Sequence, residues 1–346
     1  MTKRYLGNII TPNPTAPAGP YESDAASGVW SLAEAFAYSK AGLWPTAGNA
    51  APRALFAGGG TGVIRLNVID SISIGTLGNA TDYGDLTDTT DGLAGCSSNT
   101  TAIFAGGNNG SAYQNVIQYV SLSSAGNASD FGDLTQARSY LASSSSQTRG
   151  IFGGGSNGSD QNTIDYITIA STGNGTDFGD LTQARDGVSG SSSPTRGLFF
   201  MGQTTSYTNT IDYVTIASTG NATDFGDTLY SASGVASCSN STRALVAGGS
   251  DSSFTADDIN YVTIATTGNA TDFGNLSLSR SGPSGAASSE RAVFGGGVFY
   301  SGSWQRTNVI DYVTISSTGN AADFGDLTQS ADARGSASNA HGGLAA

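Results

Sequence analysis

Six copies of one segment, a composition rich in small residues, and short alternating apolar runs predict an all-β fold, a six-bladed β-propeller of four-stranded blades. Glycine supplies 49 of the 346 residues, and Gly, Ser, Thr, Asn and Asp all disfavour helix interiors. A repeat of this length with four strand-like runs is typical of a propeller blade. The aromatic residue of a DFG or DYG triplet marks each copy, at intervals of 47 to 51 residues: Tyr83, Phe131, Phe178, Phe225, Phe273 and Phe324.

Each copy has four parts, separated by turn residues. A stretch of small residues, such as YLASSSS, comes first and suits the crowded axis of a ring. An apolar run that ends in glycines follows, as in GIFGGG, and then an alternating β-branched run, as in NTIDYVTI. The last part, as in GTDFGDLT, follows the turn STGN, whose residues tolerate the positive φ of a tight hairpin. One copy alone buries too little, so neighbouring copies must stack to form a continuous core.

The repeat also predicts how the ring closes. The first copy begins at its second strand, RALFAGG at residues 53–59, and a first-strand stretch without a partner, ARGSASNA, lies at residues 333–340. We expect this stretch to complete the first blade, which removes the open edge of a sheet. The terminal HGGLAA has no place in the repeat. Cys96 and Cys238 occupy the same repeat position three blades apart, so we expect them to be buried and too distant for a disulfide.

The order of the parts resembles the kelch repeat over roughly residues 53–346. That family has an Arg ahead of the first strand, a Gly-Gly doublet at the end of the second, and an aromatic residue in the fourth. Such an Arg follows the fourth part here at Arg138, Arg185 and Arg280. The family's fourth-strand Trp is Phe or Tyr in every copy, and one copy departs from the doublet with Met201–Gly202. The doublets stand at 58–59, 106–107, 154–155, 248–249 and 296–297. The resemblance implies a propeller architecture and no particular function.

Residues 1–52 have no counterpart in the repeat, and we interpret them as an anchoring segment. Ser31 and Glu34 form a capping box, which predicts one short helix at about residues 31–40. The sequence GVWSL, followed by AGLWP, resembles segments of structural proteins of tailed bacteriophages. The alternative is a helix that only braces the ring. The residues expected to dock onto an assembly are Trp30, Leu32, Phe36, Tyr38 and Trp44.

Charge and hydropathy argue against several partners. The formal net charge of −13 disfavours nucleic acid and anionic membrane surfaces, both of which attract Lys and Arg. No apolar stretch reaches the ~20 residues of a membrane helix, so no membrane insertion is expected. The N-terminus lacks the apolar core of a secretory signal, so we expect release by another route, such as cell lysis.

The copies differ most in the linker between the second and third strands. Variable loops on a rigid ring commonly carry binding, and aromatic side chains there favour sugar or protein ligands. Sequence drift in unconstrained loops is the alternative. The longest linker, GGGVFYSGSWQRTN in the last blade, is the best single candidate. The candidate binding residues are Tyr113, Tyr207, Phe254, Phe299, Tyr300 and Trp304.

No catalytic residue, cofactor or metal site is expected, so we do not predict an enzyme. The chain has one histidine, which cannot supply the ligand set of the copper oxidases built on kelch repeats. Pairs of aspartates recur around five of the DFG or DYG triplets, and Asp272 is paired with Asn275 in the sixth, but equivalent pairs on every blade do not form one active site. We interpret them as solvated strand ends, and the recurring NAT, NAS and NGT sequons as turns.

Two functions fit these observations. In the first, the chain is a structural protein of a phage virion, in a tail fibre, baseplate appendage or head-surface spike. Residues 1–52 would bind other virion proteins, and several copies of an outward propeller would stabilise the particle or bind a host-surface glycan or protein. In the second, the ring is a free or cell-surface lectin-like module that binds carbohydrate or protein.

Overall fold

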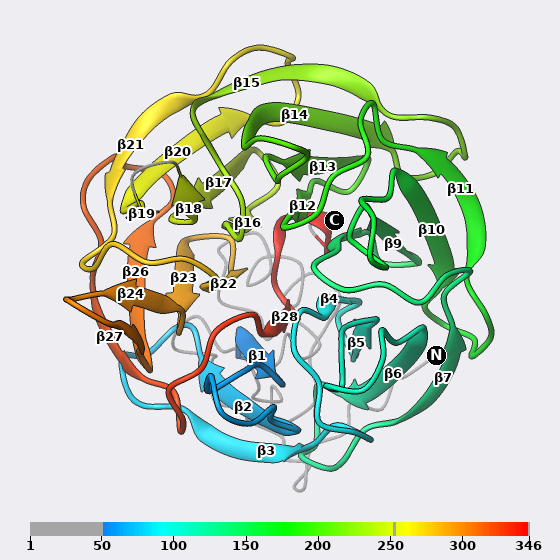
Figure 1. Ribbon diagram of the computed structural model, residues 1–346, viewed down its shortest axis with the longest axis horizontal. Coiled ribbons are helices and arrows are strands. Elements are labelled where there is room, and N and C mark those ends of the chain that lie inside the picture. Colours follow the sequence, from blue (N-terminus) through cyan, green and yellow to red (C-terminus); the bar gives the residue numbers. More distant parts are fainter. Residues whose placement is uncertain (1–50, 252–253, 345–346) are drawn as a thin grey trace, which may run out of the picture. The chain divides into compact units, whose positions relative to one another are not determined.

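Six antiparallel four-stranded sheets stand around a central axis in the ring formed by residues 53–344 (Figure 1). The computed structural model describes residues 51–251 and 254–344. The all-β, six-bladed prediction is confirmed. The predicted helix at about residues 31–40, like the rest of the segment up to residue 50, lies outside the described residues.

The strands follow the predicted order of the four parts. The first blade contains β1 (Arg53–Ala57), β2 (Val68–Ser73), β3 (Thr81–Asp85) and β28 (Gly335–Ser338). The second contains β4 (Ala94–Ser97), β5 (Thr101–Ala105), β6 (Val116–Ser121) and β7 (Ser129–Asp133). The third contains β8 (Ala142–Ser145), β9 (Arg149–Gly153), β10 (Thr163–Thr168) and β11 (Thr176–Asp180). The fourth contains β12 (Ser189–Ser192), β13 (Arg196–Phe200), β14 (Thr208–Thr215) and β15 (Thr223–Ala232).

The last two blades each carry an additional two-stranded hairpin. The fifth blade contains β16 (Ala236–Ser239), β17 (Arg243–Ala247), β20 (Asp258–Thr263) and β21 (Thr271–Asn275), with the hairpin β18 (Ser250–Asp251) and β19 (Phe254–Thr255). The sixth contains β22 (Ser284–Ala287), β23 (Arg291–Gly295), β26 (Val309–Thr314) and β27 (Ala322–Asp326), with the hairpin β24 (Val298–Tyr300) and β25 (Trp304–Arg306). A short 3-10 helix, η1 (Gly342–Leu344), follows β28.

The C-terminal strand closes the ring as predicted. β28 pairs with β1 in an antiparallel register that sets Ala54 opposite Ser338 and Ala57 opposite Gly335. The segments near residues 53 and 338 therefore share one sheet, seen in Figure 1 as the red strand beside the blue one. This pairing occupies the inner edge of β1, which would otherwise be an open template for another chain.

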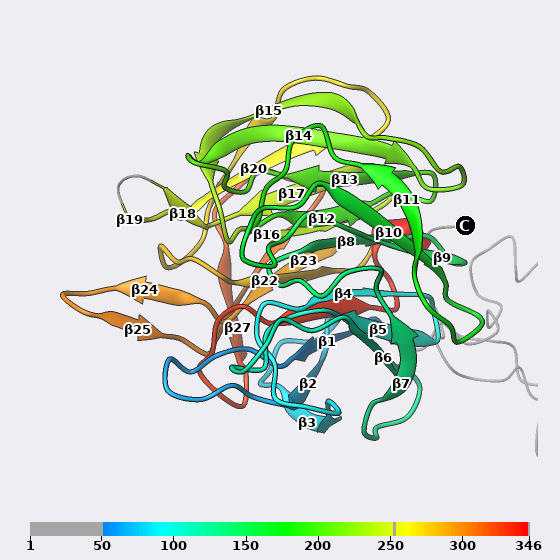
Figure 2. The same ribbon diagram turned by 45° about the vertical axis from the view of Figure 1, so that its right-hand side comes forward.

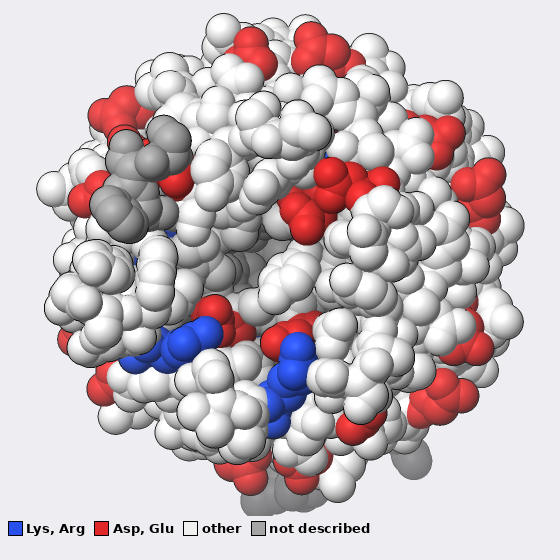
Figure 3. Space-filling view, in the orientation of Figure 1, with Lys and Arg blue, Asp and Glu red and all other residues white. Residues whose placement is uncertain are grey.

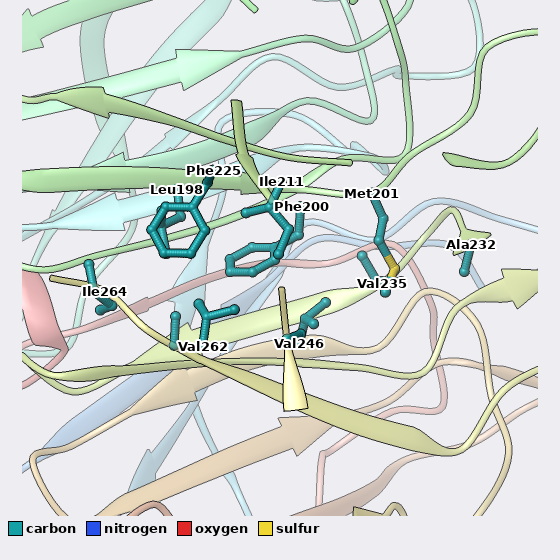
Figure 4. Packing of buried hydrophobic residues seen from close by; sticks show 12 residues of the cluster. Leu198, Phe200, Met201, Ile211, Phe225, Ala232, Val235, Val246, Val262 and Ile264 are labelled. Carbon is teal, nitrogen blue, oxygen red and sulfur yellow. The ribbon is translucent and has the colours of Figure 1, made fainter. Parts of the chain in front are cut away.

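The hydrophobic core is divided into six clusters, one between each pair of neighbouring blades. Figure 4 shows the cluster between the fourth and fifth blades, where Phe200 and Phe225 lie against Val246 and Val262. Each of these side chains is at most 3% exposed, and burying one such side chain stabilises by about 1.5–3 kcal/mol. The core thus forms only when blades stack, as expected for a repeat protein.

A buried ion pair links each of four blades to the linker that precedes it. In the fourth blade, Arg185 Nη2 lies 3.0 Å from Asp212 Oδ2, and both side chains are fully buried. The carboxylate also accepts hydrogen bonds from the backbone and hydroxyl of Thr182, in the preceding blade. Burial lowers the pKa of Arg185, while Asp212 raises it. The equivalent pairs are Arg138–Asp165, Arg280–Asp311 and Arg334–Asp70.

The second and fifth blades replace this pair with neutral groups. In the second, Gln118 stands at the Asp position and accepts hydrogen bonds from Thr87, while Thr90 stands at the Arg position. In the fifth, Asn260 stands at the Asp position, and the Tyr230 hydroxyl donates to the carbonyl of Gly248. The fold therefore contains two natural substitutes for a buried charge pair.

The STGN turn fastens each blade to its neighbour at the outer rim. The side chain of Asn221 accepts a hydrogen bond of 3.1 Å from the backbone of Asp180, in the preceding blade. Gly179 has φ of +145°, and a Cβ there would lie 2.5 Å from the carbonyl oxygen of Gly220. Equivalent asparagine bonds occur at all six interfaces. The repeated STGN turn therefore forms an interface between blades as well as a hairpin.

An arginine at the start of the second strand makes another contact between blades. Arg196 stacks over the ring of Tyr213, 4.6 Å from its centroid, and donates to the carbonyl of Ile264 in the next blade. Blades three, five and six repeat the arrangement, whereas in blade one Arg53 stacks on Tyr83 of the outermost strand. The second blade has Thr101 at this position, so its interface with the third blade lacks the arginine.

Candidate binding site

The linkers between second and third strands and the linkers between blades emerge on one face, as predicted. Backbone bridges join the two sets, for example between Gln203 and Asp186, or between Val298 and Ser281. We call this the loop face; Figure 3 looks onto it and shows it hollowed at its centre, with acidic and basic side chains beside the hollow. The binding candidates and the channel mouth therefore share one surface.

The hairpin of the sixth blade projects farthest from the ring in Figure 2. Tyr300 and Trp304 face each other across its two strands, with ring centroids 5.4 Å apart, and they are 47% and 50% exposed. Aromatic side chains this exposed contribute little to the core.

The other predicted loop residues differ in accessibility. Tyr113 is 36% exposed, whereas Tyr207 and Phe299 are half-buried. The side chain of Phe254 lies outside the described residues. So do Trp30, Leu32, Phe36, Tyr38 and Trp44, the predicted anchor.

A closed belt of six backbone hydrogen bonds encircles the mouth of the central channel. One residue from each blade-to-blade linker donates its N–H to the carbonyl of its counterpart one blade earlier, over 2.7–3.0 Å. All six residues have φ between +54° and +65°, the left-handed region that favours glycine. The belt residues are Gly92, Tyr140, Gly187, Gly234, Gly282 and Ala333.

Tyr140 departs from the glycines of the belt, and the sequence analysis missed it. A left-handed conformation costs a residue with a Cβ about 1–2 kcal/mol, yet Tyr140 adopts it at φ of +56°. Its side chain is 44% exposed and lines the cavity at the mouth. Burial raises the pKa of Tyr140 to about 12, helped by Asp91, Asp332 and Asp186. Comparing copies would have found it, since four of six have glycine there.

Carboxylates surround the mouth unevenly. Asp91 pairs with Arg65 at 3.1 Å, and Asp332 pairs with Arg306 at 3.3 Å. Asp186 forms no ion pair with any described residue; burial raises its pKa, and the nearby carboxylate of Asp160 adds to the increase. The side of the mouth near blades three and four therefore keeps an unpaired negative charge.

The channel below the mouth is narrow and is blocked at its far end. Its serines bond to neighbouring blades, as where Ser192 Oγ donates to the carbonyl of Ser145 over 2.7 Å. His341 Nε2 lies 3.2 Å from the carbonyl oxygen of Ser97, and Nδ1 accepts a hydrogen bond from Gly343. Burial lowers the pKa of His341 to about 4. The terminal HGGL, which the repeat did not place, is thus a plug.

The two cysteines also lie along this channel. Cys96 and Cys238 are buried and free, as expected. Burial raises the pKa of Cys96 to about 12, which disfavours the thiolate form.

Comparison with protein-family models and with curated proteins returned no match. Among the described residues, no group of three or more His, Cys, Asp or Glu side chains could hold a metal ion. No described helix is long and apolar enough to cross a membrane.

Proposed function

We propose that this protein is a recognition component of a tailed-bacteriophage virion. Residues 1–52 attach it to other virion structural proteins, and several copies of the propeller face outwards as binding modules. The observation that carries the binding role is the exposed Tyr300–Trp304 pair on the projecting hairpin of the sixth blade. The partner is a glycan or protein on the host surface.

Exposed apolar groups concentrate on the loop face. Eight large hydrophobic side chains among the described residues are exposed, and six of them belong to this face. Exposed apolar groups gathered on one surface support a binding role. The six are Val63, Ile64, Tyr113, Tyr140, Tyr300 and Trp304.

The charge of the ring supports a partner that is not a polyanion. Residues 53–346 contain no lysine and eleven arginines. Every one of these arginines makes an ion pair or stacks on an aromatic ring. Few cations are therefore free to bind phosphates.

Two experiments test the two halves of this proposal. Deleting residues 1–52 should abolish incorporation into particles; normal incorporation would contradict the anchoring role and favour a free lectin-like module. For the binding half, adsorption of the purified protein to host cells is measured for Trp304→Ala. Removing a central aromatic anchor costs about 2 kcal/mol, so at least tenfold weaker adsorption is expected.

The matched control is Leu77→Ala. Leu77 is 57% exposed in the turn between β2 and β3, at the opposite end of the strands from the loop face. Its truncation should leave adsorption unchanged. Equal losses for both variants would mean that adsorption is non-specific and that the hairpin is not the anchor.

A further inference from the structure

We infer that the cup at the channel mouth binds a single neutral pyranose, the terminal sugar of a glycan, through Tyr140, Asp186 and Gln203. This inference rests on the proposed function in taking the ring to be a binding module, and it names a second contact surface and its ligand class.

The cup has the size of one sugar ring. Its volume is about 340 Å³, near the lower end of the range for small-molecule sites. It is blind, because the serine-lined channel beneath it holds only about 50 Å³ and ends at His341. A single ring can enter the cup, whereas a chain cannot thread through it.

Three polar side chains that line the cup, those of Tyr140, Asp186 and Gln203, form no ion pair and no hydrogen bond to another side chain among the described residues. Asp186 and Gln203 are held together by two backbone hydrogen bonds, and the Gly187 amide next to Asp186 donates to the carbonyl of Tyr140. By contrast, Asp91 and Asp332, which also lie near the Tyr140 phenol, are occupied by arginines.

This set of groups matches a sugar. An aromatic ring packs on the apolar C–H face of a pyranose, while a carboxylate and a carboxamide bond its adjacent hydroxyls. The walls add small apolar groups from Leu141 and Val188. Asp186, with Asp160 beside it, repels uronic acids, sialic acids and phosphates, so the cup disfavours anionic sugars.

The strained backbone of Tyr140 makes the inference testable without a folding artefact. Its counterparts in four blades are glycines, so Tyr140→Gly restores the preferred residue and keeps the belt. The variant should fold, which a thermal unfolding curve verifies, and any loss of binding then reports the missing phenol ring.

The experiment uses the full chain and a panel of free neutral monosaccharides, followed by saturation-transfer NMR and titration. At least one sugar should bind, and Tyr140→Gly and Asp186→Asn should each weaken it tenfold or more. Leu77→Ala should bind as the unchanged protein does. Binding to no neutral sugar, or equal binding by Tyr140→Gly, would overturn the inference.

Failure of this inference is separable from failure of the proposed function. Host-cell adsorption that is lost in Trp304→Ala but kept in Tyr140→Gly would overturn the sugar cup and leave the recognition role standing. If the proposed function and the sugar cup are both correct, Trp304→Ala and Tyr140→Gly should each lose adsorption. Of these two variants, only Tyr140→Gly should bind the monosaccharide more weakly.

Discussion

Arg185→Ala should destabilise the ring far more than the double change Arg185→Thr with Asp212→Gln. The single change leaves the Asp212 carboxylate fully buried without its cation. Breaking a buried pair in this way costs about 3–5 kcal/mol. The carbonyls of Thr210 and Phe199 also lose the guanidinium as a donor, at roughly 1 kcal/mol each.

The double change copies the arrangement of the second blade. There, the Gln118 side chain accepts from the backbone and hydroxyl of Thr87 at 2.8 and 3.0 Å, and Thr90 replaces the arginine. A glutamine in place of Asp212 can accept from Thr182 in the same way and carries no charge. We therefore expect the double change to cost about 2 kcal/mol, from the two carbonyls alone.

Urea unfolding followed by far-UV circular dichroism measures the difference. The midpoint should fall strongly for Arg185→Ala and recover most of that loss in the double variant, with an unchanged slope. Equal midpoints for the two variants would refute the reasoning, because the cost would then come from lost packing of the arginine stem and not from an unpaired charge.

Three further predictions concern the rim, the belt and the plug. Thr101→Arg should stabilise by about 0.5–1 kcal/mol in the same urea assay, since the new guanidinium can stack on Tyr119 and reach the next blade; no gain would mean that the rim contacts are neutral. Ala333→Gly should stabilise by about 1 kcal/mol, because φ of +54° disfavours a Cβ; a lower urea midpoint would contradict this. His341 has a pKa lowered from 6.5 to about 4, so the folded state holds fewer protons than the unfolded state and stability falls as pH drops from 6.5 towards 4. Hydrogen exchange in β28 and η1 should show this loss, and His341→Gln should abolish it; the same pH dependence in that variant would assign it to other groups.

The architecture was predictable because its signals are local and repeated. Alternation in NTIDYVTI, glycines after GIF and the STGN turn each specify one strand or turn, and six copies leave little ambiguity. The closure also followed from the repeat, since one copy lacked a first strand and ARGSASNA lacked a partner.

The buried ion pair could have been predicted by comparing the copies of the repeat. An aspartate recurs in the middle of an apolar strand, and it becomes Gln118 or Asn260 in the two copies where the arginine is Thr90 or Ala232. This matched change within one chain indicates contact.

Two features depend on geometry that no local pattern contains. The belt joins linkers about one repeat apart through backbone atoms. Glycine in four other copies marks the position of Tyr140 as left-handed, but nothing in the sequence shows that these positions bond to one another. The plug is a unique segment, and nothing in HGGL indicates that His341 lies against Ser97. The roles predicted for Phe254 and for residues 1–52 concern parts that the structure does not describe, and they stay predictions.

Because β1 pairs with β28, the first sheet cannot be completed until the end of the ring has been synthesised. Ala54 leaves the ribosome about 280 residues before its partner Ser338, which at ~5–20 residues per second is a delay of roughly 15 to 60 seconds. Throughout that interval the inner edge of the first sheet has no partner strand, and the last hydrogen bonds of the belt, at Ala333, cannot form. During synthesis the ring stays open at this edge, and its exposure to aggregation depends on how quickly Gly335–Ser338 follow.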